Sequence, residues 1–205
     1  AIQGNRQERV FAIAPGVSVA LAEMTVRSGG GEDGAGIYNQ GSLSLTGVRL
    51  MPHVADDFSG GALYNANHAV LENVVLLGNT ALFGAAIYNA GVLELRDVRV
   101  QRNRHTVDGG GAGLFNSSLG QATIERSSFI KNQARVGLGG GAIYNNGLVE
   151  VSNSTISRNR ARISTGGALV TDVNGVTTLS NVTLVRNQAR FVSGGIANFG
   201  VTFVH

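Results

Sequence analysis

The 205-residue chain has no cysteine, no tryptophan and only two prolines. The absence of cysteine excludes disulfide bonds and thiolate metal sites. Long apolar runs are also missing: no stretch reaches the roughly 18 consecutive apolar residues that cross a bilayer, so we expect no membrane insertion by this segment. Helical apolar spacing is absent as well, which indicates an all-β protein.

Charged residues are sparse in this sequence. Sixteen Lys and Arg residues against thirteen Asp and Glu residues give a formal net charge of +3. A nucleic-acid-binding protein more often carries a dense basic block, and this sequence has none. We therefore expect no nucleic-acid partner.

What the chain does have is glycine, 30 residues of it, placed within a repeat. Each repeat contains a box made of a small residue, an aliphatic residue, an aromatic residue and asparagine. The boxes end at Asn39, Asn65, Asn89, Asn116 and Asn145, and then decay to Thr171 and Asn198. Successive boxes lie 26, 24, 27, 29, 26 and 27 residues apart. A period of this length is typical of stacked, solenoid architectures.

Two further segments of each repeat alternate between apolar and polar residues. In one of them Leu93 and Leu95 flank Glu94, which is the period of a half-buried strand. Three short strands and three corners per repeat predict a right-handed, single-stranded parallel β-helix of about seven rungs, with residues 1–205 in a single domain. Neither end shows a polar cap, so we expect a segment of a longer protein or ends that partners cover.

A second asparagine series marks another corner of the repeat. Its members are Asn79, Asn103, Asn132, Asn159 and Asn187. Stacked amides can hydrogen-bond both the turn backbone and the amide of the next rung. The series therefore predicts a structural asparagine ladder and not a set of ligands.

The aromatic residues of the box form a column of their own. They are Tyr38, Tyr64, Tyr88, Phe115 and Tyr144. We expect this column to pack inside the coil, next to the small residues of the box. A platform on which sugar rings stack is the alternative.

The box Gly141-Ala142-Ile143, together with Phe129-Ile130-Lys131-Asn132, resembles the repeats of the chlamydial polymorphic outer-membrane proteins. Other rungs replace the phenylalanine with Leu76, Val100, Ile156 or Leu184. More widely, the chain is similar to secreted right-handed β-helix repeat proteins of bacteria. This resemblance implies an autotransporter passenger that is secreted or displayed on the bacterial cell surface and that is often adhesive.

Basic residues recur around the corner that carries the second asparagine series. Arg102, Lys131, Arg158 and Arg186 precede the asparagine, Arg104 and Arg160 follow it, and Arg135, Arg162 and Arg190 lie three residues beyond it. Stacked about 5 Å apart, these cations repel one another unless something anionic lies along them. The edge is therefore predicted to contact an acidic glycan or an acidic surface of a host or neighbouring cell. A hydrated edge that discourages strand pairing is the alternative.

Acidic residues gather in the loops before two of the glycine runs. They are Glu32, Asp33, Asp56 and Asp57, and His53 is close to them in the sequence. Adjacent rungs would bring the four carboxylates together as an oxygen-rich site for Ca²⁺. Two acidic loops without a metal are the alternative, and no other cofactor is expected.

Enzymes built on β-helices place acids and bases on one outward face. Here Glu94 and Glu150 lie two rungs apart, about 10 Å, which is wide for an inverting carboxylate pair. We assign no catalytic residue. The leading hypothesis is a non-enzymatic structural or adhesive β-helix module. The alternatives are a polysaccharide lyase, glycoside hydrolase or binding module for an acidic polysaccharide, and a filament subunit that self-associates end to end.

Overall fold

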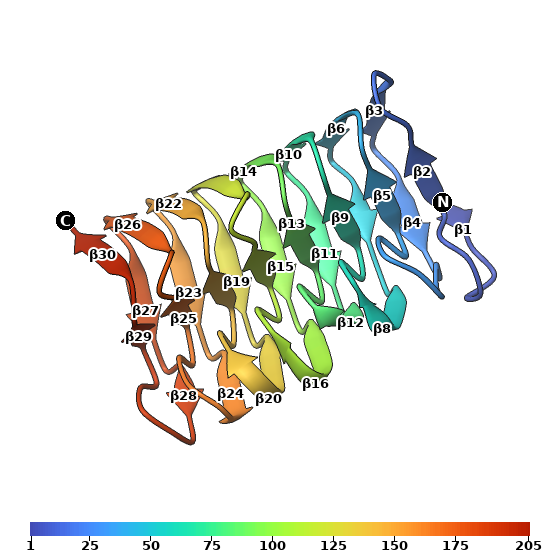
Figure 1. Cartoon of the computed structure of the whole chain (residues 1–205). Helices are drawn as coiled ribbons and strands as arrows, with labels where there is room; N and C mark the ends of the chain where they lie inside the picture. Colours follow the sequence, from blue (N-terminus) through green and yellow to red (C-terminus); the bar gives the residue numbers. More distant parts are fainter.

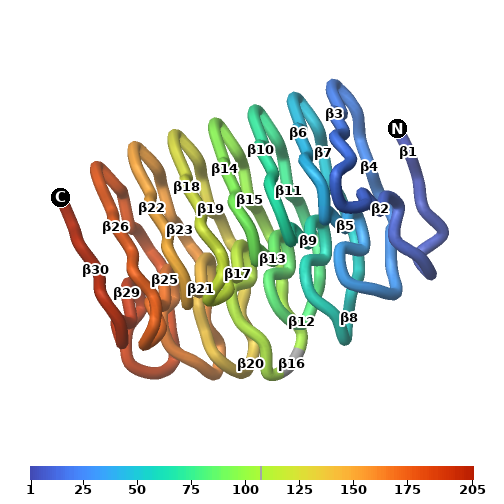
Figure 2. Tube along the Cα trace, turned by 45° about the horizontal axis from the view of Figure 1, so that its top comes forward, coloured from blue at the N-terminus to red at the C-terminus, as the bar shows by residue number. Residues whose placement is uncertain are grey.

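The computed structural model describes every residue of the chain except Val107. The described residues form no helix, and so none that could cross a membrane. Instead, 30 short strands build four parallel sheets that run along one axis (Figures 1 and 2). The predicted all-β parallel β-helix is confirmed. It has about eight turns, one more than predicted, because the first and last segments of the chain also pair in register.

Sheet B contains the box of the repeat. Its strands are β2 (Phe11–Ile13), β5 (Ile37–Asn39), β9 (Leu63–Asn65), β13 (Ile87–Asn89), β17 (Leu114–Asn116), β21 (Ile143–Asn145), β25 (Leu169–Thr171) and β29 (Ile196–Asn198). A glycine with positive φ precedes each middle strand. At Gly111, with φ +60°, a Cβ atom would lie 2.2 Å from the carbonyl oxygen of Leu114, so only glycine fits this turn.

Sheet C follows sheet B in each turn and carries the alternating segment. Its strands are β3 (Ser18–Ala22), β6 (Ser42–Thr46), β10 (His68–Glu72), β14 (Val92–Arg96), β18 (Gln121–Glu125), β22 (Leu148–Ser152), β26 (Val176–Ser180) and β30 (Val201–Val204). In β14, Leu93 and Leu95 are buried while Val92 and Arg96 are exposed. The sequence alternation therefore predicted the inward and outward faces correctly.

Sheet A is the third wall of the coil. Its strands are β1 (Ile2–Gln3), β4 (Thr25–Arg27), β7 (Arg49–Leu50), β11 (Val75–Leu77), β15 (Arg99–Gln101), β19 (Ser128–Ile130), β23 (Thr155–Ser157) and β27 (Thr183–Val185). Three strands per turn in sheets A, B and C match the prediction.

Sheet D was not predicted. Its strands are β8 (Val54–Ser59), β12 (Thr80–Phe83), β16 (Arg104–Gly110), β20 (Gln133–Gly139), β24 (Arg160–Ile163) and β28 (Gln188–Ala189). The sequence gives this region variable length and no common motif, so it looks like a loop. Backbone pairing to the turn above and below makes it a fourth sheet, with irregular register between β12 and β16.

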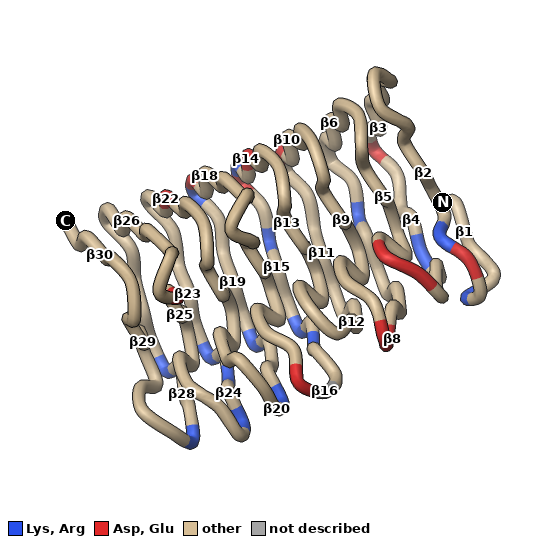
Figure 3. Tube along the Cα trace, viewed as in Figure 1, with Lys and Arg blue, Asp and Glu red and all other residues tan. Residues whose placement is uncertain are grey.

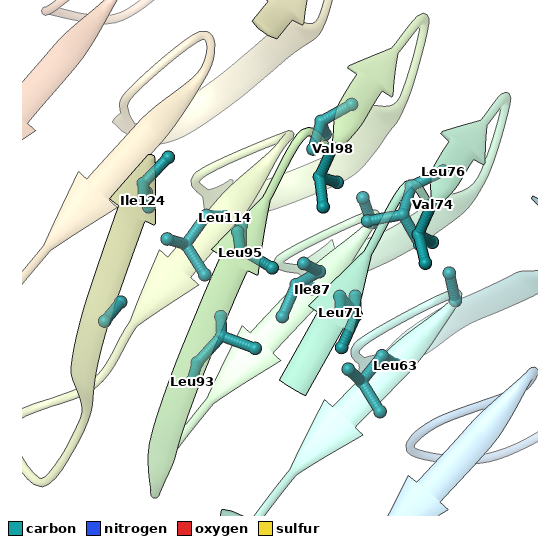
Figure 4. Packing of buried hydrophobic residues seen from close by; sticks show 14 of the residues in the cluster. Leu63, Leu71, Val74, Leu76, Ile87, Leu93, Leu95, Val98, Leu114 and Ile124 are labelled. Atoms are coloured by element: carbon teal, nitrogen blue, oxygen red, sulfur yellow. The ribbon is translucent and has the colours of Figure 1, made fainter. Parts of the chain in front are cut away.

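The interior is filled by columns of equivalent residues from successive turns. One column was predicted and is confirmed: Leu45, Leu71, Leu95, Ile124, Val151 and Leu179 are all buried and paired in register. Figure 4 shows part of the core, in which these side chains meet aliphatic residues of sheets A and B. Burial of apolar side chains at every level is what holds the turns together.

Candidate functional site

Two buried asparagine ladders account for the most regular polar residues. At the corner between sheets B and C, each side-chain amide from Asn39 to Asn116 donates to the Oδ1 of the next asparagine at 2.8–2.9 Å. At the corner between sheets A and D, the Asn79–Asn187 series repeats the same bond at 2.9–3.0 Å. The predicted ladder is confirmed. Because these amides are used within the coil, they are not available to a ligand.

His53 belongs to the second ladder as a substitute for asparagine. Its Nδ1 accepts a hydrogen bond from the backbone N–H of Gly29 at 3.0 Å, and its Nε2 lies 3.1 Å from the carbonyl oxygen of Val26. Asn79 makes the matching amide contact to Leu50 O one turn later. This pattern requires the neutral imidazole with its proton on Nε2. Burial accordingly lowers the pKa of His53 from 6.5 to about 4.

The aromatic column was expected to be core or near-core packing; it lies on the outer side of sheet B and not among the interior columns, yet Tyr144 is buried and the other four rings are half-buried. Ile87 and Asn89 point inward from β13, so Tyr88 between them points outward. Successive rings of the column have centroids 4.7–5.3 Å apart. The ring faces therefore cover one another, and the Arg9 guanidinium lies 4.6 Å from the centroid of Tyr38 at the first ring. A sugar has no free ring face on which to stack within this column.

The four predicted calcium ligands do not converge: two of them contact other groups, and the other two are exposed. Glu32 pairs with Arg9, and Asp33 Oδ1 accepts the backbone N–H of Ser59 at 2.6 Å. Asp56 and Asp57 are exposed on β8. Among the described residues, no three His, Cys, Asp or Glu side chains converge as metal ligands would. The structure therefore does not bring this acidic group together.

The outward carboxylates Glu94 and Glu150 of sheet C do not lie next to one another. Glu94 forms an ion pair with Arg96, and its Oε1 lies 3.8 Å from Nε2 of His68. The register Glu94–Thr123–Glu150 places the two carboxylates two turns apart, as predicted. This geometry does not assemble an acid–base pair.

The basic residues do come together, on one face that is formed by sheet D and its corner with sheet A. We call the following nine residues the basic face: Arg102, Arg104, Lys131, Arg135, Arg158, Arg160, Arg162, Arg186 and Arg190. All nine are exposed. Figure 3 shows them as a blue edge along β16, β20, β24 and β28. None of the nine forms an ion pair with any carboxylate that the structure describes.

The basic face is ordered in three columns parallel to the axis. The corner column is Arg102, Lys131, Arg158 and Arg186; the first strand column is Arg104, Gln133, Arg160 and Gln188; the second strand column is Arg135, Arg162 and Arg190. Paired backbone register aligns the first strand column. Sequence reasoning identified all nine cations but missed Gln133 and Gln188. Their signal was the ladder spacing, because each follows a ladder asparagine directly.

Two shallow hollows lie among these columns. One, of about 320 Å³, is lined by Arg102, Arg104, Lys131 and Gln133, among other residues. The second, of about 230 Å³, is lined by Arg160, Arg162, Gln188 and Arg190 over the small side chains of Ala161 and Ala189. Each hollow thus offers cationic groups and one carboxamide, which are hydrogen-bond donors suited to a carboxylate or sulfate.

The corner column has an unusual backbone. Arg102, Lys131, Arg158 and Arg186 have φ between 54° and 56°, the left-handed region. One turn earlier the same position holds Gly78, with φ +68°. A residue with a Cβ costs roughly 1–2 kcal/mol in this conformation, and glycine avoids that cost. Four consecutive cations at such positions indicate a use for their side chains outside the fold.

Comparisons with protein-family models, with curated proteins and with solved structures find no match to this chain. The resemblance to chlamydial outer-membrane repeats therefore stays a hypothesis. Inference about function depends on the chemistry of the basic face.

Proposed function

We propose that the chain is a non-enzymatic, adhesive β-helix module, secreted or displayed on a bacterial cell surface, that binds an acidic polysaccharide along the basic face. The observation that carries the proposal is the set of nine exposed cations, fixed in columns and without a carboxylate partner among the described residues. Neighbouring turns of a parallel sheet lie about 4.8 Å apart, well within the Debye length of about 8 Å at physiological salt. A linear polyanion relieves the mutual repulsion of such columns.

The rigidity of the scaffold supports this proposal. The corner column is joined directly to the buried asparagine ladder, whose amides and backbone N–H groups are hydrogen-bonded from turn to turn. Donors held on a rigid lattice lose less conformational entropy when a ligand binds. An adhesive module needs this kind of extended, repeated contact, because many weak ionic contacts add up along one chain.

The test is titration of the whole protein with polygalacturonate, with neutral dextran as the uncharged comparison. The double variant R158E/R186E is expected to weaken binding by at least about tenfold, since each exposed ionic contact contributes up to ~1 kcal/mol. The matched control is R27E/R49E, which makes the same charge change at two exposed residues of sheet A outside the basic face. Equal binding by the two double variants, or equal binding of dextran, would overturn the proposal.

A further inference from the structure

The charge of the second strand column changes sign along the axis. Asp56 follows Ala55, which pairs with Ala81, and Ala81 pairs with His105. The next residues of these strands, Asp56, Leu82 and Thr106, continue the second strand column of Arg135, Arg162 and Arg190 toward the N-terminus, with an irregular register. The Oγ1 of Thr106 donates to the carbonyl oxygen of Asp56 at 3.0 Å, so β8 and β16 touch beside the shorter β12 that lies between them in the sheet. Along the axis this side of sheet D thus passes from acidic through neutral to basic.

The cations of the other two columns begin one turn closer to the N-terminus, at β16. Before Arg102 the corner column has Gly78, and before Arg104 the first strand column has Thr80 and Val54. A second exposed carboxylate, Asp57, follows Asp56 on β8, and Asp108 is exposed on β16 itself. In Figure 3 the sheet D edge is red at β8, on the N-terminal side of the blue strip, and red again at β16, within the strip.

We propose that the acidic polysaccharide lies parallel to the solenoid axis, that its footprint begins at β16, and that Asp56 and Asp57 on β8 set this boundary by repulsion. This inference rests on the proposed function and adds the direction and extent of the bound chain. A polyanion that lies along the axis meets a cationic or amide donor at every turn from β16 to β28. One that crosses the axis meets a single turn of each column and leaves the other turns unneutralised.

The two hollows mark positions along this path. The first spans the turns of β12, β16 and β20, with its cations on the last two, and the second lies at the turns of β24 and β28. Arg160 holds the second hollow in shape, because its Nη2 donates to Gln188 Oε1 at 2.9 Å across neighbouring strands. Two acidic sugar units of one chain can therefore be bound at once, because the two hollows lie on adjoining turns, those of β20 and β24, which also carry Arg135 and Arg158.

A substitution that removes the acidic charge at the N-terminal boundary of the footprint tests this inference. The variant D56R places a cation on β8, two turns before the proposed start of the footprint at β16, and we expect it to bind long oligogalacturonates about fivefold more tightly than the native protein, as one exposed repulsion becomes an attraction. The matched control is E72R, which makes the same charge change at an exposed residue of sheet C. A length series of oligogalacturonates is the second measurement. With the native protein, affinity should rise with length and level off once the oligomer spans the turns from β16 to β28.

The outcomes separate this inference from the proposed function. If the native protein binds polygalacturonate but D56R and E72R have equal affinities, or affinity grows with length without levelling, the boundary is wrong while the function stands. If no polyanion binds, both fail. Binding to vesicles of phosphatidylcholine and phosphatidylserine that is tighter than binding to any oligogalacturonate would replace the polysaccharide with a membrane surface as the partner. That outcome would use the exposed Ile163 and Phe191 beside the second strand column.

Discussion

Two corners of the coil have the same backbone conformation but different residues. At the corner between sheets C and A, the residues with positive φ are Glu23, Gly47, Asn73, Asp97, Arg126, Asn153 and Asn181; at the corner between sheets A and D they are Ser28, Gly78, Arg102, Lys131, Arg158 and Arg186. Asn, Asp and Gly are the residues that tolerate this conformation. They fill most positions of the first corner and one position of the second. Local backbone preference therefore does not explain the cations of the second corner.

The two corners also differ in how their charges are paired and in what lies beneath them. Arg126, the one cation of the first corner, contacts Asp97 at 3.0 Å and also Glu125. The cations of the second corner have no such partner among the described residues. Inside the first corner lie Val48, Val74 and Val98 and then the hydroxyls of Ser127 and Ser154, whereas a continuous amide ladder lies inside the second. The second corner thus combines a rigid polar interior with unpaired external charge, as a binding edge requires.

The largest expected effect is a loss of stability when an asparagine inside the second corner is replaced by valine, a residue found inside the first corner. Asn103→Val should lower the free energy of unfolding by about 4 kcal/mol, because buried groups that lose a hydrogen-bond partner cost about 1–3 kcal/mol each. The backbone N–H of Asn79 loses its acceptor, and Leu76 O loses its donor. Urea denaturation measures the change.

Ser127→Val is the control at the first corner, where Val98 already occupies the equivalent position. Ser127 Oγ accepts the backbone N–H of Val98 and donates to the carbonyl oxygen of Glu125 at 2.8 Å. The cost should be about 2 kcal/mol, less than for Asn103→Val, because the contact to Glu125 is only part-buried and water can replace it. If Asn103→Val costs no more than Ser127→Val, the amide ladder does not stabilise the second corner.

Acid should destabilise the sheet D side of the molecule through its histidines. Burial lowers the pKa of His53 and of His105 from 6.5 to about 4. The unfolded chain takes up these protons below pH 6.5 while the folded protein does not. Each histidine therefore contributes stability that is fully present above pH 6.5 and is lost as the pH falls to 4, about 3 kcal/mol each.

The variant H53N isolates this effect, because asparagine is the residue that the ladder uses elsewhere. Urea denaturation at pH 7 and at pH 4.5 should show a smaller loss of stability for H53N than for the native protein. The carboxylates titrate equally in both proteins, so the difference reports His53 alone. An identical pH dependence in both proteins would show that His53 is not held as the neutral imidazole.

Exchanging external residues between the corners should change binding more than stability. In R158N/R186N the second corner receives the residue typical of the first, and affinity for polygalacturonate should fall about tenfold, equivalent to 1.4 kcal/mol. The reverse exchange, N153R/N181R, should create no comparable binding, because the first corner lacks the strand columns of sheet D. Titration of both variants checks this. Similar affinities in the two would show that net charge alone governs binding.

The sequence predicted the parts of the fold that repeat. A ladder asparagine recurs with the period of the turn, so spacing alone determines which residues pair. The same spacing places His53 in the ladder, 26 residues before Asn79, but the sequence does not indicate that a histidine can replace a ladder asparagine. Recognising it required the contacts of both ring nitrogens.

Other features depended on geometry that spacing does not determine. Tyr88 points outward because its neighbours Ile87 and Asn89 both point inward, and the aromatic character of the column suggested the opposite. Sheet D has strands from two to seven residues long, and its order comes from pairing with adjacent turns. The basic columns were predictable residue by residue, since each is tied to a ladder asparagine. The positive φ of the corner column was not, because cations rarely occupy that conformation.

The smallest expected effect is a gain in stability. Arg158→Gly should raise the free energy of unfolding by about 0.5–1 kcal/mol, because glycine removes the cost of a Cβ at φ 56°, less the entropy that glycine loses on folding. Asn153→Gly, at φ 49° in the first corner, should change stability by only a few tenths of a kcal/mol, since asparagine already tolerates this conformation. Urea denaturation of the two variants at neutral pH compares them directly. A stabilised R158G protein that also binds polygalacturonate more weakly would show that the corner arginines are kept for binding at a cost in stability. Destabilisation by R158G would show that Arg158 contributes to the fold itself.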